Sequence, residues 1–493
     1  MTNHHDNEMV SLKEITYKPV NHEFRIQELK PNSTKKRDTF FLYFSVLTVN
    51  LLMIVNGSSL VWTSPVIPQL ESTNPEINPL GEKITTFQIS ILVGLPSLFT
   101  IFGSFFFGKL PDVIGRKNTL ICISLGTFLS NVAVAFGKHI YLYYAGRSIA
   151  NLCLGLLFVV LPIYLNEICE DHNRAKHGCL MMFFLPFGSL YGYLLGPITS
   201  IKLFTLLCAA PLIPQLIFLW LLIPETPVYT ASKGEKGATM KILRKLRSNK
   251  TDYEIREDYN QIEAMLKANS KADRGGFKNI FETRASRKGF IVGLGCCLSI
   301  HMSGVPVIMG FLGPIFNDAG TNLSGNMVAI LVGCVKLLFF FVTITIVGRF
   351  GRRPLLLLSS IGTAIPLGVL AVHFYLNSIH SPMIVNIRWL PVACVLIYIA
   401  IYSLGLGSIA TSLLTELFPN NVRAIATSVI MTIGNTLLLL LTTGFPIVSH
   451  FLGVHYCIGI FSVSCVFSFI FIYYMLPETK GKSTLEIQEI LSK

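Results

Sequence analysis

The sequence has little charge for its length. Only 14% of its 493 residues are Asp, Glu, Lys or Arg, whereas soluble domains carry about 25%. Hydrophobic residues make up 52% of the chain, and its mean hydropathy is +0.58. This composition excludes a protein that folds mainly in water, so we expect most of the chain to lie in a membrane.

The sequence also lacks the motifs of enzymes and metal sites. It has no Gly-x-Ser-x-Gly, no His-Glu-x-x-His, no nucleotide-binding glycine loop and no paired carboxylates within its apolar runs. The eleven cysteines have the spacing of neither metal ligands nor a disulfide framework. Repeated filter segments of a channel are absent as well. We therefore predict no catalytic residue, no metal site, no cofactor and no enzyme activity.

The net charge of +13 could fit a nucleic-acid-binding protein, but the positions of the basic residues argue against one. Thirty-four of the forty Lys and Arg residues lie in the two terminal tails and in the loops that follow even-numbered apolar spans. Only Lys83, Lys138, Lys202 and Arg388 lie in loops on the opposite side. By the positive-inside rule both termini are then cytoplasmic. Because the N-terminal tail has no signal peptide, the first span should remain as an anchor.

A membrane-spanning helix needs roughly 20 apolar residues, and the chain has twelve such runs. They predict an all-α integral membrane protein. The runs lie near 40–67, 86–108, 119–136, 140–165, 179–200, 203–223, 290–317, 325–347, 354–376, 389–415, 424–448 and 451–476.

The one long polar stretch between spans divides these runs into two sets of six. It contains helical patterns over Ala238 to Arg247 and Tyr253 to Lys267. The predicted organisation is a cytoplasmic N-terminal tail (1–39), a six-helix bundle (40–223), a cytoplasmic linker with short helices (224–289), a second six-helix bundle (290–476) and a cytoplasmic C-terminal tail (477–493).

Glycine and proline interrupt two spans at corresponding places. Span 7 contains Ser303-Gly304-Val305-Pro306 and Gly313-Pro314, and span 1 contains Gly57-Ser58-Ser59 and Pro65. Proline removes a backbone hydrogen bond and bends a helix. Broken helices in matching positions of two halves indicate a transport site.

Three motifs occur twice, about 240 residues apart, at the cytoplasmic edges of spans. Such a repeat predicts two equivalent halves with a central path between them, which is the plan of a transporter. The repeated pairs are Gly115-Arg116-Lys117 with Gly351-Arg352-Arg353, Glu167 and Arg174 with Glu416 and Arg423, and Pro224-Glu225-Thr226 with Pro477-Glu478-Thr479.

These motifs resemble those of the sugar porter family in the major facilitator superfamily. The loop from Gly108 to Lys117, the pattern Pro162-x-Tyr164-x-x-Glu167 and the stretch Glu416 to Arg423 carry the resemblance. The stretch Trp62 to Leu70 is similar to the first span of insect facilitated trehalose and glucose transporters. The resemblance implies twelve helices in two six-helix bundles. It also implies a conformational gate formed by Asp112, Arg116, Glu167, Arg174, Arg352, Glu416 and Arg423.

The same resemblance implies a solute site whose usual hydrogen-bonding residues have changed in this chain. Ile300 and His301 replace two glutamines, and Ser408 and Ala410 replace prolines of span 10. Asn435 is the one polar contact that clearly persists. The residues at the family's solute-contacting positions are Met182, His301, Pro306, Lys336, Thr411 and Asn435. Outside the solute site, in the implied gate, Gly348 replaces an acid of the second-half loop.

Lys336 is the most unusual of these residues. It lies twelve residues before Gly348, roughly 18 Å along a helix, near the middle of the membrane. A lysine there costs on the order of 3 kcal/mol unless it faces water or a partner, so we expect it to face the central cavity. That position would favour an anionic or carbonyl-bearing solute. The alternative for Lys336 is a structural contact with a carbonyl of a neighbouring helix. For His301, cavity exposure and a packed, hydrogen-bonded position remain equally open.

We predict a facilitated carrier, because no Asp or Glu lies well inside any span and proton coupling generally needs a buried carboxylate. The expected solute is a sugar such as trehalose or a hexose. Two alternatives stay open: a carrier of another small solute, and a sensor that does not transport. The expected location is the cell membrane, with lipid as surroundings and with neither a nucleic acid nor an obligate protein as partner.

Overall fold

The computed structural model describes residues 38–271, 280–317, 323–418, 420–480, 482 and 484–492. Its described helices belong to one compact unit that begins at Asp38, and no β-strand occurs in these ranges. The tail predicted over residues 1–39 lies outside the described residues, apart from Asp38 and Thr39.

The first half of the chain forms long helices with short irregular connections. Its elements are α1 (Phe40–Val61), α2 (Thr63–Leu70), α3 (Thr86–Phe106), α4 (Leu110–Ile114), α5 (Arg116–Ala135), α6 (Ile140–Ile168), α7 (Asp171–Leu195), the 3-10 turn η1 (Gly196–Ile198), α8 (Ile201–Ala209) and α9 (Leu212–Leu221). The polar segment that follows forms α10 (Pro227–Ser232), α11 (Lys236–Leu246) and α12 (Asp252–Lys271). The two predicted linker helices are thus present.

The second half repeats this pattern. Its elements are α13 (Arg284–Met302), α14 (Val305–Gly310), α15 (Leu312–Asn317), α16 (Gly325–Phe350), α17 (Arg352–Ser378), η3 (Pro382–Asn386), α18 (Leu390–Leu404), α19 (Ile409–Glu416), α20 (Asn420–Leu452), α21 (Val454–Met475) and α22 (Thr484–Ser492). The last helix lies in the predicted C-terminal tail, where the sequence analysis named no helix.

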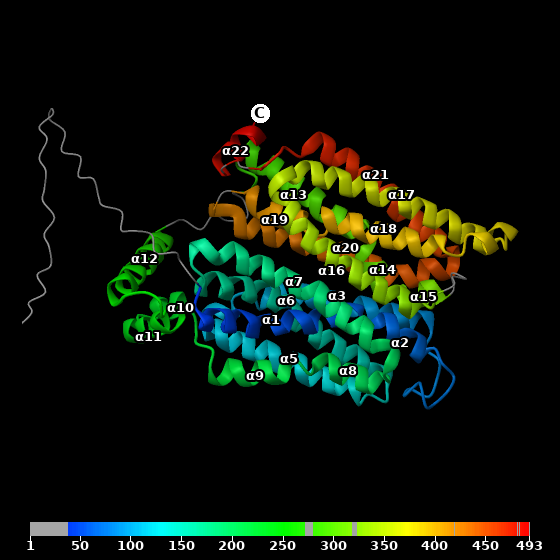
Figure 1. The fold of residues 1–493 in the computed structure, drawn as a ribbon, viewed down its shortest axis with the longest axis horizontal. Helices are drawn as coiled ribbons and strands as arrows, with labels where there is room; N and C mark the ends of the chain where they lie inside the picture. The colour runs from blue at the N-terminus through cyan, green and yellow to red at the C-terminus, as the bar shows by residue number, and fades with distance from the viewer. Residues whose placement is uncertain are drawn as a thin grey trace, which may run out of the picture. The chain divides into compact units, whose positions relative to one another are not determined.

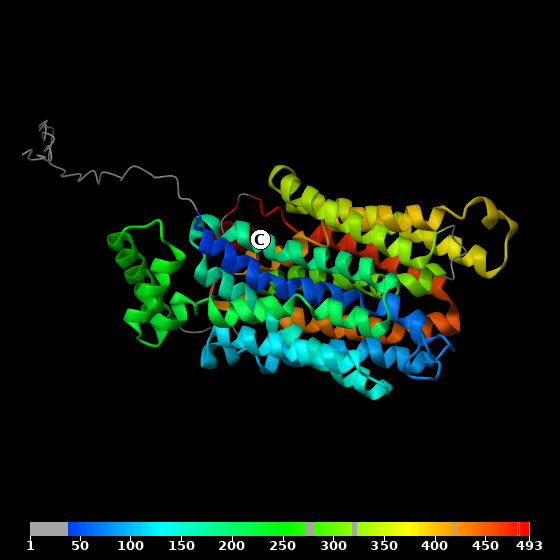
Figure 2. The ribbon, with the colours of Figure 1, turned by 60° about the horizontal axis from the view of Figure 1, so that its bottom comes forward.

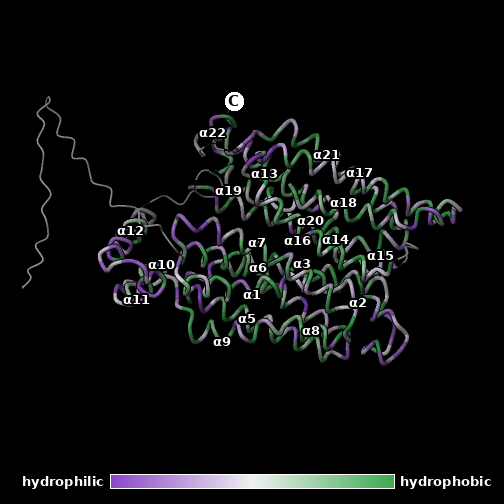
Figure 3. The backbone as a smooth tube through the Cα atoms, viewed as in Figure 1, coloured by the Kyte–Doolittle hydropathy of each residue, from purple (hydrophilic) through white to green (hydrophobic). Residues whose placement is uncertain are grey.

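Twelve helical stretches in the described residues are long and apolar enough to cross a membrane, from Phe40–Val61 to Val454–Met475. This confirms the predicted number of spans. Figures 1 and 2 show the long helices side by side, with α10–α12 beyond one end and α2 and α15 at the other. We call these the linker end and the far end. Figure 3 shows hydrophilic residues over α11 and α12 and hydrophobic ones along the spans.

Hydroxyl side chains begin many of these helices. At the start of α3, Thr85 accepts a hydrogen bond from the Gln88 N–H, and the Gln88 side chain accepts one from the Thr85 N–H. Such a capping box satisfies amide groups that have no partner within the helix. Single hydroxyl caps stand at Thr39, Ser200, Thr226, Thr283 and Ser324.

Four spans are interrupted. Span 7 breaks at Gly304, whose φ of 79° favours glycine, and again at Phe311. Span 1 breaks at Trp62, between the predicted positions Gly57-Ser58-Ser59 and Pro65, which are themselves helical. The breaks at Pro211 in span 6 and over 405–408 in span 10 were not predicted. In span 10, Ser359 of α17 stabilises the break because its hydroxyl accepts a hydrogen bond from the Leu406 N–H at 3.1 Å.

Candidate solute path between the two halves

The two halves meet along a seam, by which we mean the contacts of α1, α2, α3 and α7 with α14, α15, α16 and α20. At the far end, one buried apolar cluster includes Trp62, Val66 and Tyr193 of the first half and Leu312 of the second. A separate cluster fills the first half between the middle of the spans and the linker end. Apolar packing therefore joins the halves at the far end.

A hydrogen bond between Thr63 and Gly310 adds to this closure. In a continuous helix the Gly310 carbonyl would accept from the N–H of residue 314, but Pro314 has no N–H. The hydroxyl of Thr63 in α2 donates to this carbonyl instead, at 2.7 Å. The proline thus leaves an acceptor that the opposite half uses.

The Gly313 N–H and the Met309 carbonyl, another backbone pair of span 7, also bond to side chains of the first half. The Gly313 N–H donates to Oγ of Ser64 at 2.9 Å, and the hydroxyl of Tyr193 donates to the Met309 carbonyl at 2.7 Å. In an unbroken helix these two backbone groups would bond each other. A buried backbone group without a partner is costly, so the contact between the halves compensates for the break.

The other break in span 7, at Ser303-Gly304, is held within the second half. The hydroxyl of Tyr398 in α18 donates to the Ser303 carbonyl at 2.7 Å. Both residues are fully buried. Non-helical backbone at membrane depth requires such partners, so α14 has a defined position between two breaks.

Lys336 lies beside this broken segment. Its Nζ is 3.1 Å from the sulfur of Met309 in α14, and its side chain is partly exposed. One turn earlier, Gly333 packs against Leu190 and Tyr193 of α7, so this face of α16 borders the seam. A thioether is a weak acceptor and an ammonium group has three donors. The Lys336 ammonium group therefore has N–H donors available for a stronger acceptor at the seam.

His301 and Asn435 come close together from α13 and α20. The His301 ring packs against Gly434, directly before Asn435, and both side chains are partly exposed. Nδ1 of His301 has no hydrogen-bond partner among the described residues. Pro306, also partly exposed, is the second residue of α14. These three residues belong to helices that border the seam or, for α13, pack directly against one that does.

Met182 and Thr411 are less closely defined. On α7, Gly188 and Gly192 pack against α1, whereas Phe183 contacts Phe341 of α16 at a ring-centroid distance of 4.7 Å. Helical spacing puts Met182, which is 39% exposed, between these two faces. It is thus on the side of α7 that faces the seam. Thr411 is partly exposed on the short α19.

Arg116 forms the centre of an ion-pair group at the linker end of the first half. Its guanidinium lies 3.0 Å from Glu167 and 3.1 Å from Asp112. The hydroxyl of Thr226 also donates to Glu167. Since Arg116 and Glu167 are 12% and 13% exposed, water screens this pair less than an ordinary surface pair.

Glu225 binds the start of α5, a role that sequence reasoning missed. It accepts hydrogen bonds from the backbone N–H groups of Arg116 and Lys117, each at 3.1 Å. Gly115 turns the chain there with a φ of 97°. Helix N-termini attract anions through their unpaired N–H groups and dipole. Burial raises the pKa of Glu225 in spite of these bonds.

Glu478 does the same at the start of α17. It accepts from the N–H groups of Arg352 and Arg353, each at 3.0 Å, after the positive-φ Gly351. Burial tends to raise the pKa of Glu478, but hydrogen bonds from four backbone N–H groups outweigh it and lower that pKa. The signal in the sequence was the duplicated Pro-Glu-Thr motif.

The sequence pattern of the family described as "Sugar (and other) transporter" matches residues 30–491. The chain belongs to this transporter family. Membership identifies the protein as a transporter of the sugar porter type, not an enzyme, and confirms the family resemblance seen in its motifs.

Two relatives of this sugar transporter cover nearly its whole length. The "Facilitated trehalose transporter Tret1-2 homolog" of Drosophila sechellia is 29% identical over 460 residues, which are 92% of each chain. The "Facilitated trehalose transporter Tret1" of Polypedilum vanderplanki is 28% identical over 454 residues, 91% of this chain and 88% of the relative.

A solved structure, the partially occluded inward-open xylose transporter XylE from E. coli, aligns with a TM-score of 0.74 at 19% identity. The alignment covers 90% of this chain and 100% of that one. At this identity the likeness concerns the fold. It confirms the expected all-α major facilitator fold.

Of the remaining predicted gate residues, Arg423, Arg174 and Arg352 all interact with other residues. Nε of Arg423 donates to the Phe418 carbonyl at 3.1 Å. The side chain of Glu416 lies outside what the structure describes. The gating role of these residues therefore stays a prediction.

A second ion-pair group at the linker end was also missed. Asp38 accepts hydrogen bonds from Asn173 at 2.7 Å and Lys176 at 3.1 Å, and His177 approaches it at 3.6 Å. Burial tends to raise the pKa of Asp38, but bonds from Asn173, Tyr43 and Lys176 lower it to about 2. This carboxylate is therefore ionised at neutral pH and ties the start of α1 to α7.

Proposed function

We propose that this transporter carries a sugar such as trehalose or a hexose by facilitated diffusion, with its two halves opening in turn to either side of the membrane. The observation that carries the proposal is the division of span 7 backbone groups between the halves, through Thr63, Ser64 and Tyr193. A contact made of a few hydrogen bonds can form in one state and break in another. It is the kind of gate that alternating access needs.

The sequence relatives support the choice of solute. The two described above are named facilitated trehalose transporters, and each match covers more than 85% of both chains. We infer a passive mechanism because Glu167 is the only Asp or Glu within the twelve spans, and it lies next to the end of its span. Movement of solute coupled to protons generally uses a carboxylate deep in the membrane.

The proposed solute site is the seam between the far-end closure and the linker end. Lys336 and Asn435 would donate hydrogen bonds to sugar hydroxyl groups, and His301 could donate or accept one. Met182, Pro306 and Thr411 would shape the walls. Because this set offers fewer amides than the family pattern, we expect lower affinity or broader selectivity than in a sugar carrier that keeps them.

The proposed gate at the linker end consists of Asp112, Arg116, Glu167, Arg174, Arg352, Glu416 and Arg423. In the proposed cycle, these residues hold the linker end closed when the far end opens. We further propose that both termini and α10–α12 are cytoplasmic and that the protein resides in the cell membrane, because the basic residues concentrate at the linker end.

The test is uptake of radiolabelled solutes by proteoliposomes that contain the purified full-length protein. We expect saturable uptake of trehalose or a hexose that does not change when the pH gradient is collapsed. Polyols and small organic acids complete the panel. Uptake of none of these solutes by correctly inserted protein would contradict the proposal, and uptake that needs a pH gradient would contradict its passive part.

Lys336 favours one second candidate, a solute with a carboxylate or carbonyl group. The ammonium group near Met309 at the seam has a partner of little strength. An acidic sugar would bind it through a charge-assisted hydrogen bond, which is stronger than a neutral one. Preferred uptake of uronic acids over neutral sugars in the same panel would support this candidate over the first.

A further inference from the structure

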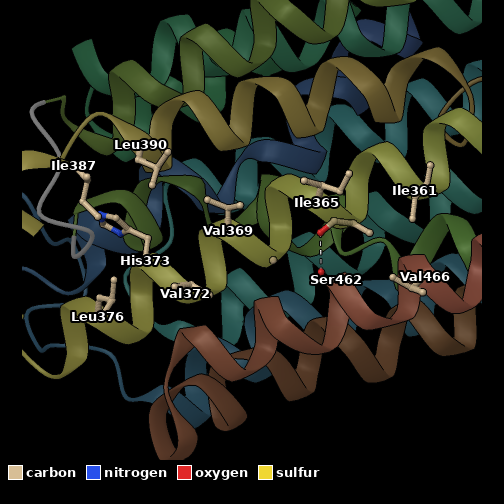
Figure 4. A pocket seen from close by; sticks show the side chains of 12 residues that line it. Ile361, Ile365, Val369, Val372, His373, Leu376, Ile387, Leu390, Ser462 and Val466 are labelled. Atoms are coloured by element: carbon tan, nitrogen blue, oxygen red, sulfur yellow. Dashed lines mark hydrogen bonds between the residues drawn. The ribbon is translucent and has the colours of Figure 1, made fainter. Parts of the chain in front are cut away.

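A hollow of about 450 Å³ lies on the second half, between α17, the segment leading into α18, and α21 (Figure 4). Its volume is within the range of about 300–1,000 Å³ typical of small-molecule sites. Ten of its twelve lining residues are aliphatic or glycine, and none is charged. Among them Ile365 is 64% and Val372 57% exposed. Since α17 is a membrane span, we infer that the hollow opens to lipid.

The polar residue of interest in this hollow is His373. Its side chain is 1% exposed, and neither ring nitrogen has a hydrogen-bond partner among the described residues. The other polar lining residue, Ser462, is satisfied because its hydroxyl donates to the Ala364 carbonyl at 2.7 Å. Leaving a buried polar group without a partner destabilises the fold. A bound ligand with a hydrogen-bonding group would remove this destabilisation.

The depth of His373 indicates how such a ligand would lie. His373 is 21 residues beyond Arg352, the first residue of α17, or roughly 31 Å along the helix. The hydrocarbon layer is about 30 Å thick, so His373 lies near the far-end boundary of the membrane. In Figure 4 its ring is near Ile387 and Leu376, at one end of the row of α17 side chains.

The apolar lining extends from His373 toward the middle of the membrane. Ile361, at the other end of the row, is 12 residues away, or roughly 18 Å. The hollow therefore has a hydrogen-bonding group at the lipid–water boundary and an apolar surface about one leaflet long below it. This is the shape and polarity of a single-headed membrane amphiphile that stands upright in the leaflet.

We propose that the hollow binds a membrane sterol, with the sterol hydroxyl bonded to His373. An uncharged imidazole has one donor and one acceptor nitrogen, and a hydroxyl can donate or accept. The sterol hydroxyl can therefore bond either ring nitrogen of His373, whereas the ester carbonyl of a phospholipid can only accept a hydrogen bond from the donor nitrogen. The lining offers no cation for a phosphate group. A rigid sterol body also loses little conformational entropy when it binds against Ile365 and Val369.

The experiment uses the full-length protein in phosphatidylcholine vesicles that contain a sterol with a photoreactive diazirine. After illumination, labelled peptides are identified by mass spectrometry. We expect labels on α17, α18 or α21 that excess unlabelled sterol removes. His373→Phe should reduce the labelling at least fivefold, because it keeps an aromatic ring but removes both nitrogens. Val369→Trp should reduce it similarly by filling the hollow.

The matched control is His450→Phe, which removes an exposed histidine near the end of α20 and should leave labelling unchanged. Sugar uptake and thermal unfolding of each variant establish that it is folded. Val369→Trp provides the test if His373→Phe does not fold. The proposal would be overturned if α17, α18 and α21 carried no label that excess unlabelled sterol removes. Equal labelling of wild type and His373→Phe, or equal labelling by a photoreactive phosphatidylcholine, would also overturn it and assign the hollow to acyl chains.

Discussion

Gly313 donates its backbone N–H to the hydroxyl of Ser64 across the seam, at 2.9 Å, where an unbroken helix would use the Met309 carbonyl. The opposite half thus supplies what the broken helix lacks. Because Thr63, on the same short helix α2, donates to the Gly310 carbonyl at 2.7 Å, the two neighbouring side chains form one latch.

Removal of this latch should open the far end. A typical hydrogen bond contributes about 0.5–1.5 kcal/mol, so Thr63→Val with Ser64→Ala should shift the equilibrium roughly 5- to 150-fold toward the state open at that end. The measurement is the rate at which an impermeant thiol reagent labels Ile308→Cys in a variant whose eleven native cysteines are replaced. Ile308 is 1% exposed in this structure. Thr436→Val is the control, because that hydroxyl bonds only its own helix. An unchanged rate in the double variant would contradict the latch.

Replacement of Lys336 should change affinity for the solute. Lys336→Met keeps a flexible side chain but removes the ammonium donors. A hydrogen bond to a charged group contributes about 1.5–3 kcal/mol, so we expect KM to rise roughly tenfold or more if Lys336 binds the solute, with kcat less affected. Uptake kinetics measure this. Lys202→Met, which removes an exposed lysine over the Phe136 ring, should leave KM unchanged. Identical kinetics for Lys336→Met and wild type would exclude the contact.

The two duplicated glutamates should respond to pH in opposite senses. Because the pKa of Glu478 in the folded protein is below its ordinary value of 4.5, its charge stabilises the fold above pH 4.5 and ceases to do so as pH falls through the lowered pKa. Glu478→Gln should therefore lower the Tm at pH 7, and the difference from wild type should shrink below pH 4.5.

For Glu225 the pKa is raised above 4.5, so the fold disfavours its charged form. The Tm of Glu225→Gln relative to wild type should therefore improve as pH rises through the raised pKa. Thermal unfolding in detergent between pH 3.5 and 7.5 measures both variants. Parallel pH dependence of the two variants would contradict the opposite pKa shifts of Glu225 and Glu478.

Arg147 should contribute to stability. Its Nη1 donates to the carbonyl and the hydroxyl of Ser59 at 3.0 and 2.9 Å, and its guanidinium lies 4.8 Å from the Trp62 ring. Charge-assisted hydrogen bonds and a cation–π contact together predict a loss of about 3 kcal/mol in Arg147→Met. The exposed Arg388→Met is the control for thermal unfolding. A Tm loss no larger than that of the control would argue against this role.

Length and apolar composition sufficed to predict the twelve spans, and Gly304 and Pro306 sufficed to predict the break in span 7. The break in span 10 was not predicted because no proline marks it. Its partner, Ser359, belongs to α17 and lies 47 residues before Leu406. A contact over that distance depends on packing, which periodicity does not reveal.

The candidate functional residues were likewise predicted only in part. Depth along a helix drew attention to Lys336, and the structure puts its Nζ beside Met309 at the seam; its contact with a solute stays a prediction. The roles of Glu225 and Glu478 depend on turns that bring residues more than 100 positions apart together. The duplicated motif indicated that these glutamates matter, without indicating which groups they bind.

The polar helices outside the twelve spans form two sets, one bonded to each half. Thr39 bonds the Leu246 carbonyl of α11 at 2.7 Å, and Lys250 lies 2.8 Å from Glu170, so α11 and the loop before α12 are anchored to the first half. Gln488 of α22 donates to the Leu417 carbonyl of the second half at 2.5 Å. Fluorophores on exposed residues of α11 and α22 would therefore act as two reporters, and energy transfer between them would follow the rocking of the halves without altering any residue of the solute path.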